Sequence, residues 1–139
     1  MPEFGKVYGG AWSGPVFVLT HHAPDDEEDT AITFLSGDIR FAVAMALRAA
    51  EGKALLVLGT SVARQCIEAR LIDEILVHVV PVLRGGGVRF FDRQGAAPVD
   101  LETVAVSRAG QITNLRHRVL KQSPVSWSVV AGAAIFGIE

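Results

Sequence analysis

The chain has 139 residues, a formal net charge of -2 and an apolar content of 50%. This length predicts one domain with a sizeable core, and the charge balance excludes the basic surface that binds nucleic acid. The single cysteine, Cys66, excludes an intrachain disulfide. Residues 1–15 lack the apolar core of a secretory signal, and the apolar tail Val125–Ile138 is too short to span a bilayer. We therefore expect a cytoplasmic protein that binds neither nucleic acid nor membrane.

The first part of the chain predicts two short strands and a helix. Val16–Leu19 and Ile32–Leu35 are short apolar runs typical of buried strands. Asp38–Glu51 places its apolar residues on one helical face. Ser36 or Asp38 is suited to cap the start of this helix.

The second part predicts a further alternation of strands and a helix. Ala54–Leu58 is apolar on both faces, as is typical of a central parallel strand covered by helices. A helix is expected over Val62–Arg70, and a strand that is apolar on both faces over Ile75–Val82. Two more strands are expected at Leu101–Ser107 and Thr113–Leu120. This order predicts an α/β fold with a mostly parallel sheet and an antiparallel edge.

Several polar or reactive features are better explained by structure than by chemistry. The acidic run Asp25–Asp29 favours a solvated loop, because a repelling block is not a converging ligand set. Cys66 lies among apolar residues of a predicted helix, so a small buried side chain is favoured over a nucleophile. Gly85–Gly87 lacks the Lys-Ser/Thr ending of a phosphate loop and indicates a turn. Arg116 and Arg118 are expected on a solvated strand face.

The segment after the strand at 54–58 is the strongest candidate for a binding site. Gly59 ends the strand, Thr60 and Ser61 follow, and a helix begins. Backbone N–H groups at a helix start attract anions, and glycine lets a phosphate approach the backbone closely. The alternative is an ordinary strand–helix turn with a hydroxyl cap, which the spacing alone favours.

Two histidines follow the carboxyl end of the first strand. If that strand lies beside the one at 54–58, Thr20, His21 and His22 approach the same ligand as the turn at Gly59, and a histidine there would favour a nucleotide with a 2′-phosphate. The alternative is a pair of exposed loop histidines. No third metal ligand accompanies them, so no metal is expected.

Five segments in order form a pattern that covers residues 8–121. The most specific are Leu71–Ile75, with the sequence Leu-Ile-Asp-Glu-Ile, and Pro81–Phe91, with Pro-Val-Leu, three glycines and a Phe-Phe pair. The others are residues 15–21, 32–34 and 58–66. Together they resemble the bacterial dihydrofolate-reductase-like proteins, which are similar to the reductase domain of the riboflavin-biosynthesis deaminase–reductase.

The resemblance implies a three-layer α/β/α domain over residues 1–121 and an apolar extension over residues 122–139. It implies NADPH as hydride donor and a small pteridine- or diaminopyrimidine-type substrate, as in dihydrofolate reductase or 5-amino-6-(5-phosphoribosylamino)uracil reductase. The cofactor-binding residues it implies are Gly59, Thr60, Ser61, Val62, Ala63 and Arg64 for the pyrophosphate, Thr20 and His21 for the adenosine phosphate, and Ser36 and Gly37 for the adenine.

The chain departs from the family's pattern at three places. Thr60 stands where the family usually has a second glycine. The family's first central strand, its substrate-facing segment and its first helix have no counterpart before Pro15, so the chain is expected to be N-terminally truncated and no catalytic residue is assigned. The tail Gln122–Glu139 extends past the family's usual end, and Val125–Val130 alternates like a strand.

These departures leave two hypotheses. A sheet without its central strand leaves the strands at 54–58 and 75–82 with unpaired backbone, which the tail or a second subunit is expected to fill, so a homodimer is expected. The first hypothesis is an NADPH-dependent reductase completed in this way. The second is a non-catalytic relative that retains only nucleotide binding or oligomerisation.

Overall fold

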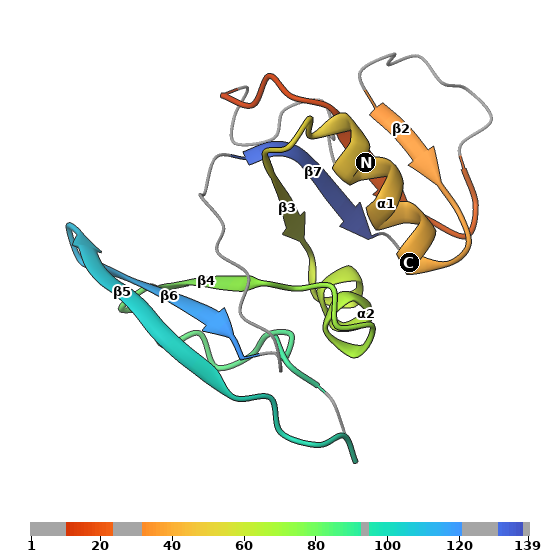
Figure 1. The fold of residues 1–139 in the computed structure, drawn as a ribbon. Coiled ribbons are helices and arrows are strands. Elements are labelled where there is room, and N and C mark those ends of the chain that lie inside the picture. The colour runs from red at the N-terminus through yellow and green to blue at the C-terminus, as the bar shows by residue number, and fades with distance from the viewer. Residues whose placement is uncertain (1–10, 24–31, 93–94, 121–130, 138–139) are drawn as a thin grey trace.

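The described part of the chain forms one parallel and one antiparallel sheet with two helices (Figure 1). The computed structural model describes residues 11–23, 32–92 and 95–120 and the backbone of a strand at 131–137. The α/β class and the mixture of parallel and antiparallel strands are as the sequence predicts.

The parallel sheet has the strand order β2-β1-β7-β3. Its strands are β1 (Val16–Leu19), β2 (Ile32–Leu35), β3 (Ala54–Leu58) and β7 (Ala131–Gly137). β7 pairs with β1 on one side and with β3 on the other, both in parallel. The C-terminal strand therefore lies in the middle of a sheet whose other strands come from the first half of the chain.

Both helices begin directly after a strand of this sheet. α1 (Ile39–Ala49) follows β2, and its N-cap Asp38 accepts a hydrogen bond from the backbone N–H of Arg40 at 2.6 Å. α2 (Thr60–Glu68) follows β3 and has Gly59 as its N-cap. These strand-to-helix turns place both helix starts at the carboxyl edge of the sheet.

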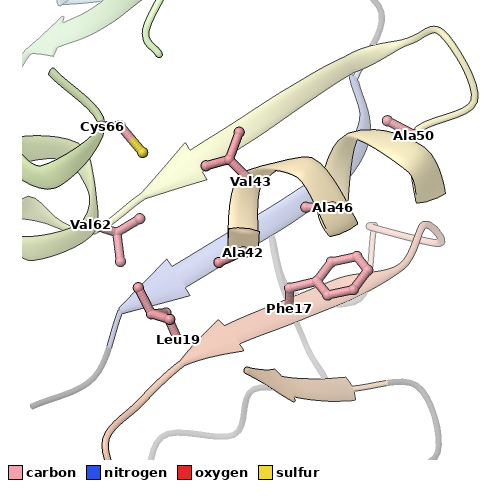
Figure 2. Close-up of a cluster of buried hydrophobic side chains, with 8 residues drawn as sticks. All are labelled: Phe17, Leu19, Ala42, Val43, Ala46, Ala50, Val62 and Cys66. Atoms are coloured by element: carbon pink, nitrogen blue, oxygen red, sulfur yellow. The ribbon is translucent and has the colours of Figure 1, made fainter. Parts of the chain in front are cut away.

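The hydrophobic core lies between the helices and one face of the sheet (Figure 2). Small side chains let α1 approach the strands closely, since two of its three buried residues, Ala42 and Ala46, are alanines and its C-cap Ala50 is buried too. Val16 and Val18 alternate with the strand residues of this core and are also buried, so the opposite face of β1 is covered too. The buried core residues are Phe17, Leu19, Ala42, Val43, Ala46, Ala50, Val62 and Cys66.

The antiparallel sheet has the strand order β4-β6-β5. It consists of β4 (Glu74–Val79), β5 (Leu101–Ala109) and β6 (Ile112–Val119). β5 and β6 form a hairpin with Gly110 at φ 61°, and the pairing register of β5 shifts between Thr103 and Ala105. Among the described residues, the extensive contacts of both helices are with each other and with the parallel sheet, not with this one.

Two expectations about the strands need correction, and a third is not tested. The first strand does not lie beside the one at 54–58, because β7 separates β1 from β3. The tail strand is Ala131–Gly137, and it fills a position between β1 and β3 rather than between the strands at 54–58 and 75–82. The expected strand at Val125–Val130 lies outside the described residues.

The strand expected over Ile75–Val82 is shorter and more exposed than its sequence predicts. β4 ends at Val79, and Val80–Val82 leave the sheet. Leu76 is 53% exposed and Val79 is 48% exposed. An apolar pattern on both faces predicts burial only when helices cover the strand. Within the described residues β4 lies at the edge of its sheet, with β6 as its one strand partner.

Candidate functional site

The candidate site is the carboxyl edge of the parallel sheet. Because β2, β1 and β3 all run in parallel, the turns that follow them lie at the same edge (Figure 1). These turns contain the implied residue pairs Ser36–Gly37, Thr20–His21 and Gly59–Thr60. β2 and β3 are three strand positions apart, or about 14 Å at the usual spacing. Ligands of open α/β sheets bind at such edges.

The turn from β3 into α2 has free backbone donors. Gly59 has φ 93° and ψ 142°, a conformation that favours glycine, and it provides no side-chain cap. The first helical hydrogen bond runs from the N–H of Ala63 to the carbonyl of Gly59 at 3.1 Å. The N–H groups of Thr60, Ser61 and Val62 therefore precede the helical hydrogen-bond ladder and have no acceptor within it. This arrangement is suited to hold an anion.

One side chain of this turn is buried in the core, and the polar side chains lie at or near the surface. Val62 is fully buried in the core and fixes the first turn of α2 against the sheet. Thr60 and Ser61 are half-buried, and within the described part of the chain neither side chain makes a hydrogen bond. Arg64 is exposed one turn further along the helix. Two hydroxyls and a guanidinium thus accompany the free amides.

The start of α1 differs from that of α2 because the side chain of its N-cap residue, Asp38, already binds a backbone N–H there. Asp38 accepts the Arg40 N–H and places a negative charge at the helix N-terminus, where it is favourable. The Asp38 carboxylate would repel a phosphate at this position. Of the two helix starts at this edge, the start of α2 is therefore the better anion site.

The end of β1 is held by the Thr20 hydroxyl. This hydroxyl donates to the carbonyl of His22 at 3.1 Å, and the His22 N–H returns a hydrogen bond at 3.2 Å. The Thr20 N–H also donates to the carbonyl of Leu35 in β2 at 2.9 Å. Thr20 is buried, whereas His21 and His22 are exposed. Thr20 therefore shapes the turn, and the histidines that follow it are available to a ligand.

The end of β2 presents an open turn. Ser36 and Gly37 are exposed, and Gly37 has φ 100° with no atom within 4 Å of the position that a Cβ would take. The residues that the family resemblance implies thus lie at three strand ends of one edge. The Gly59–Arg64 turn and the Thr20–His21 turn are not on adjacent strands, because β7 lies between them.

Other reactive groups do not form a second centre. Burial raises the pKa of the Cys66 thiol to about 11, so Cys66 is not a nucleophile at neutral pH. Among the described residues, no three His, Cys, Asp or Glu side chains gather in a group able to hold a metal ion. None of the described helices has the length and apolarity needed to cross a membrane.

Cross-strand contacts on the antiparallel sheet were not predictable from the sequence. His78 Nδ1 lies 2.6 Å from Asn114 Oδ1, and the Asn114 amide donates to the Ser107 hydroxyl at 3.4 Å. Arg116 and Arg118, expected on a solvated face, each pair with a carboxylate of a neighbouring strand. Only the strand register, which brings residues 78, 107 and 114 into one row, would have revealed these contacts.

Comparisons with known proteins agree with this architecture. The chain matches the family of the RibD C-terminal domain over residues 11–115. Among solved structures it is similar to a protein of Shewanella sp. PV-4 that is provisionally named as a riboflavin biosynthesis protein, with a TM-score of 0.68 and 21% sequence identity. That match covers 80% of this chain and 63% of the Shewanella chain, so this chain spans less than two thirds of its neighbour's length. No curated protein matches the sequence. The family match covers most of the chain, and the chain therefore belongs to the RibD C-terminal domain family.

Proposed function

We propose that this protein is an NADPH-dependent reductase of a small pteridine- or diaminopyrimidine-type molecule. The observation that carries the proposal is the uncapped start of α2 at Gly59, which offers free amides at the carboxyl edge of the sheet. Membership of the RibD C-terminal domain family supports the reductase chemistry. The same edge is where open α/β sheets bind nucleotides.

The cofactor's pyrophosphate is assigned to the turn of Gly59–Arg64. The amides of Thr60, Ser61 and Val62 and the guanidinium of Arg64 would neutralise its charge. The Ala63 N–H already donates to the carbonyl of Gly59. Ala63 would therefore help to set the conformation of the turn and would not donate to the pyrophosphate. When bound, NADPH supplies the hydride.

The adenosine end is assigned to the turns after β1 and β2. His21 is exposed beside the buried Thr20 and would face the 2′-phosphate, while Ser36 and Gly37 would lie along the adenine. Asp38 at the same end repels phosphate, so the contact to the 2′-phosphate is assigned to the β1 turn. No side chain is assigned a catalytic role, since positioning of the hydride donor and a proton from water suffice for this chemistry.

The substrate is tested by following NADPH oxidation through its loss of absorbance at 340 nm. The purified chain is mixed with NADPH and either the phosphoribosylated diaminopyrimidine or dihydrofolate. We expect turnover with one of these substrates and none without protein. Turnover that survives Gly59→Ala and Arg64→Gln unchanged would contradict the site.

A second candidate is nucleotide binding without turnover. The free amides at the start of α2 favour it, because they account for the binding of a nucleotide phosphate by themselves. It predicts saturable NADPH binding with no oxidation of either substrate. Failure to bind NADPH at all contradicts both candidates.

A further inference from the structure

α1 has one buried side and one exposed side. Its buried residues are Ala42, Val43 and Ala46, which Figure 2 shows within the core cluster. Among the described residues, the extensive contacts of α1 are with β7, β3 and α2. Two large apolar side chains of the helix lie outside these contacts, Phe41 at 56% and Leu47 at 48% exposure. The exposed side of α1 therefore has apolar surface that the described elements leave uncovered.

Four exposed residues form a stripe along this side of the helix. They are Arg40, Ala44, Leu47 and Glu51, and their spacing of four, three and four residues places them on one line of an α-helix. Glu51 directly follows the C-cap Ala50. The stripe is basic at its start, apolar in its middle and acidic at its end. Within the described part of the chain, the side chains of Arg40 and Glu51 make no ion pair.

The order of residues in this stripe is complementary to its own reverse. When two α1 helices lie antiparallel, the register that sets Arg40 against Glu51 also sets Ala44 against Leu47, and two-fold symmetry repeats both contacts. Opposite charges then meet at both ends, and a small side chain meets a large one twice in the middle. A parallel pair would instead place each charge beside its own copy.

A second contact flanks the stripe in this arrangement. Phe41 and Arg48 are seven residues apart, which is about two helical turns, so they lie on the same side of the stripe. In the antiparallel register, the guanidinium of Arg48 in one copy comes beside the ring of Phe41 in the other. Such a contact between a cation and an aromatic face is favourable, and it covers the more exposed of the two large apolar side chains.

We propose that α1 forms a symmetric antiparallel pair with α1 of a second copy of this chain. Charge complementarity selects this partner, because a second copy offers the charges of the stripe in the reverse order. The pair is weak and depends on concentration, since about three helical turns bury less area than the standard interface of a stable complex. The inference does not rest on the proposed function.

Charge reversal tests the pairing. Arg40→Glu and Glu51→Arg each place like charges together at both ends of the pair, and both changes suit the helix dipole, so neither should disturb folding. Sedimentation velocity of the intact chain over a range of concentrations measures the monomer–dimer equilibrium. We expect a dimer for the unaltered chain and dimerisation at least tenfold weaker for each variant. The matched control Arg89→Glu changes an exposed arginine outside α1 and should leave dimerisation unchanged.

Recombination of the reversed charges tests the antiparallel register. A chain that carries both changes again has opposite charges at both ends of the pair, and a mixture of the two single variants should form mixed dimers for the same reason. We expect dimerisation to recover in both cases. Failure of both to recover would overturn the proposal. So would a native chain that stays monomeric at its highest soluble concentration, or a dimer that neither single reversal weakens.

The apolar middle of the stripe is tested by a second pair of variants. Leu47→Ser removes the large side chain that packs on Ala44 of the other copy, and it should weaken dimerisation at least tenfold. The matched control Val106→Ser lies in β5, where Val106 is 63% exposed, and should leave dimerisation unchanged. Equal losses in the two variants would show that the copies associate by general hydrophobic attraction and would overturn the proposal.

Discussion

At the scale of residues, the N-caps of α1 and α2 differ, and this difference makes the start of α2 the better candidate for an anion site. Asp38 neutralises the N–H groups of α1 with its own carboxylate, whereas Gly59 leaves those of α2 free. The residue type at the N-cap thus separates a structural turn from a candidate binding turn, although both follow strands of the same sheet.

Gly59→Ala should weaken NADPH binding at least tenfold. Gly59 has φ 93°, so a Cβ brings backbone strain of roughly 1–3 kcal/mol and displaces the turn that presents the free amides. Gly52→Ala is the matched control, since Gly52 has φ 82° after α1, away from the carboxyl edge. Calorimetric titration of both variants with NADPH checks this. Equal affinities, with both proteins folded, would contradict the site.

Cys66 should make stability depend on pH in the alkaline range. Burial raises its pKa to about 11 from an ordinary 9.0, so the unfolded chain loses this proton first. The resulting stabilisation is complete below pH 9 and is lost as pH rises to about 11, by an amount on the order of 2 kcal/mol. Urea unfolding from pH 8 to 11 measures it. Cys66→Ala removes this contribution, and an identical pH dependence in the variant would refute the assignment.

At the scale of elements, ion pairs link the strands of the antiparallel sheet. Arg116 donates through Nε and Nη2 to both carboxylate oxygens of Glu74, at 2.8 and 3.0 Å. Hydrogen bonding to Glu74 raises the pKa of Arg116. The second pair is a single hydrogen bond of 3.0 Å between Arg118 and Glu102, and it is more exposed.

Glu74→Gln should lower the melting temperature by a few degrees, and Glu102→Gln by less. A bidentate, half-buried ion pair contributes more to the free energy of unfolding than a single exposed one, because water screens the exposed pair. Thermal unfolding followed by circular dichroism compares the two variants. The reverse order would show that exposure and geometry do not govern these pairs.

The sequence predicts the local elements well and their pairing poorly. The strands at 16–19, 32–35 and 54–58 are confirmed, because short apolar runs with flanking breakers carry their own signal. The boundary of β4 was wrong, since Val80 to Val82 are apolar and lie outside the sheet. Apolar composition does not distinguish a buried strand from an exposed segment that follows it.

The kind of turn at the candidate site could be predicted from the sequence, but the way the turns are arranged along the sheet could be predicted only in part. The Gly59 turn and its helix start could be expected from a strand followed by glycine and hydroxyl residues. The hydrogen bonds of Thr20 to His22 could not, since they depend on the local backbone of the turn. The position of β7 also escaped prediction, because strand pairing between residues more than 70 positions apart has no local signal.

At the scale of the whole molecule, β7 determines whether the parallel sheet is continuous. It is the strand through which β1 and β3 are connected in hydrogen bonding. The strands that carry the adenosine side and the pyrophosphate side of the candidate site therefore hold their spacing through the C-terminal segment.

Truncation after Lys121 should abolish cooperative unfolding or lower the melting temperature by more than ten degrees. It removes β7 and leaves buried N–H and C=O groups of β1 and β3 unpaired, at roughly 1–3 kcal/mol each. The summed cost of several such groups exceeds the usual free energy of unfolding of a small domain. Removal of residues 138–139 alone is the control. An unchanged melting temperature and oligomeric state by light scattering would show that β7 is not part of the stable sheet.

The most direct test of the proposed site is an NADPH titration of the intact chain followed by backbone amide shifts in nuclear magnetic resonance. We expect saturable shifts at the carboxyl edge of the parallel sheet, largest over Gly59–Arg64 and extending to His21 and Gly37, with the antiparallel strands unaffected. Absence of saturable shifts in the folded protein, or shifts centred on β4, β5 and β6, would contradict it.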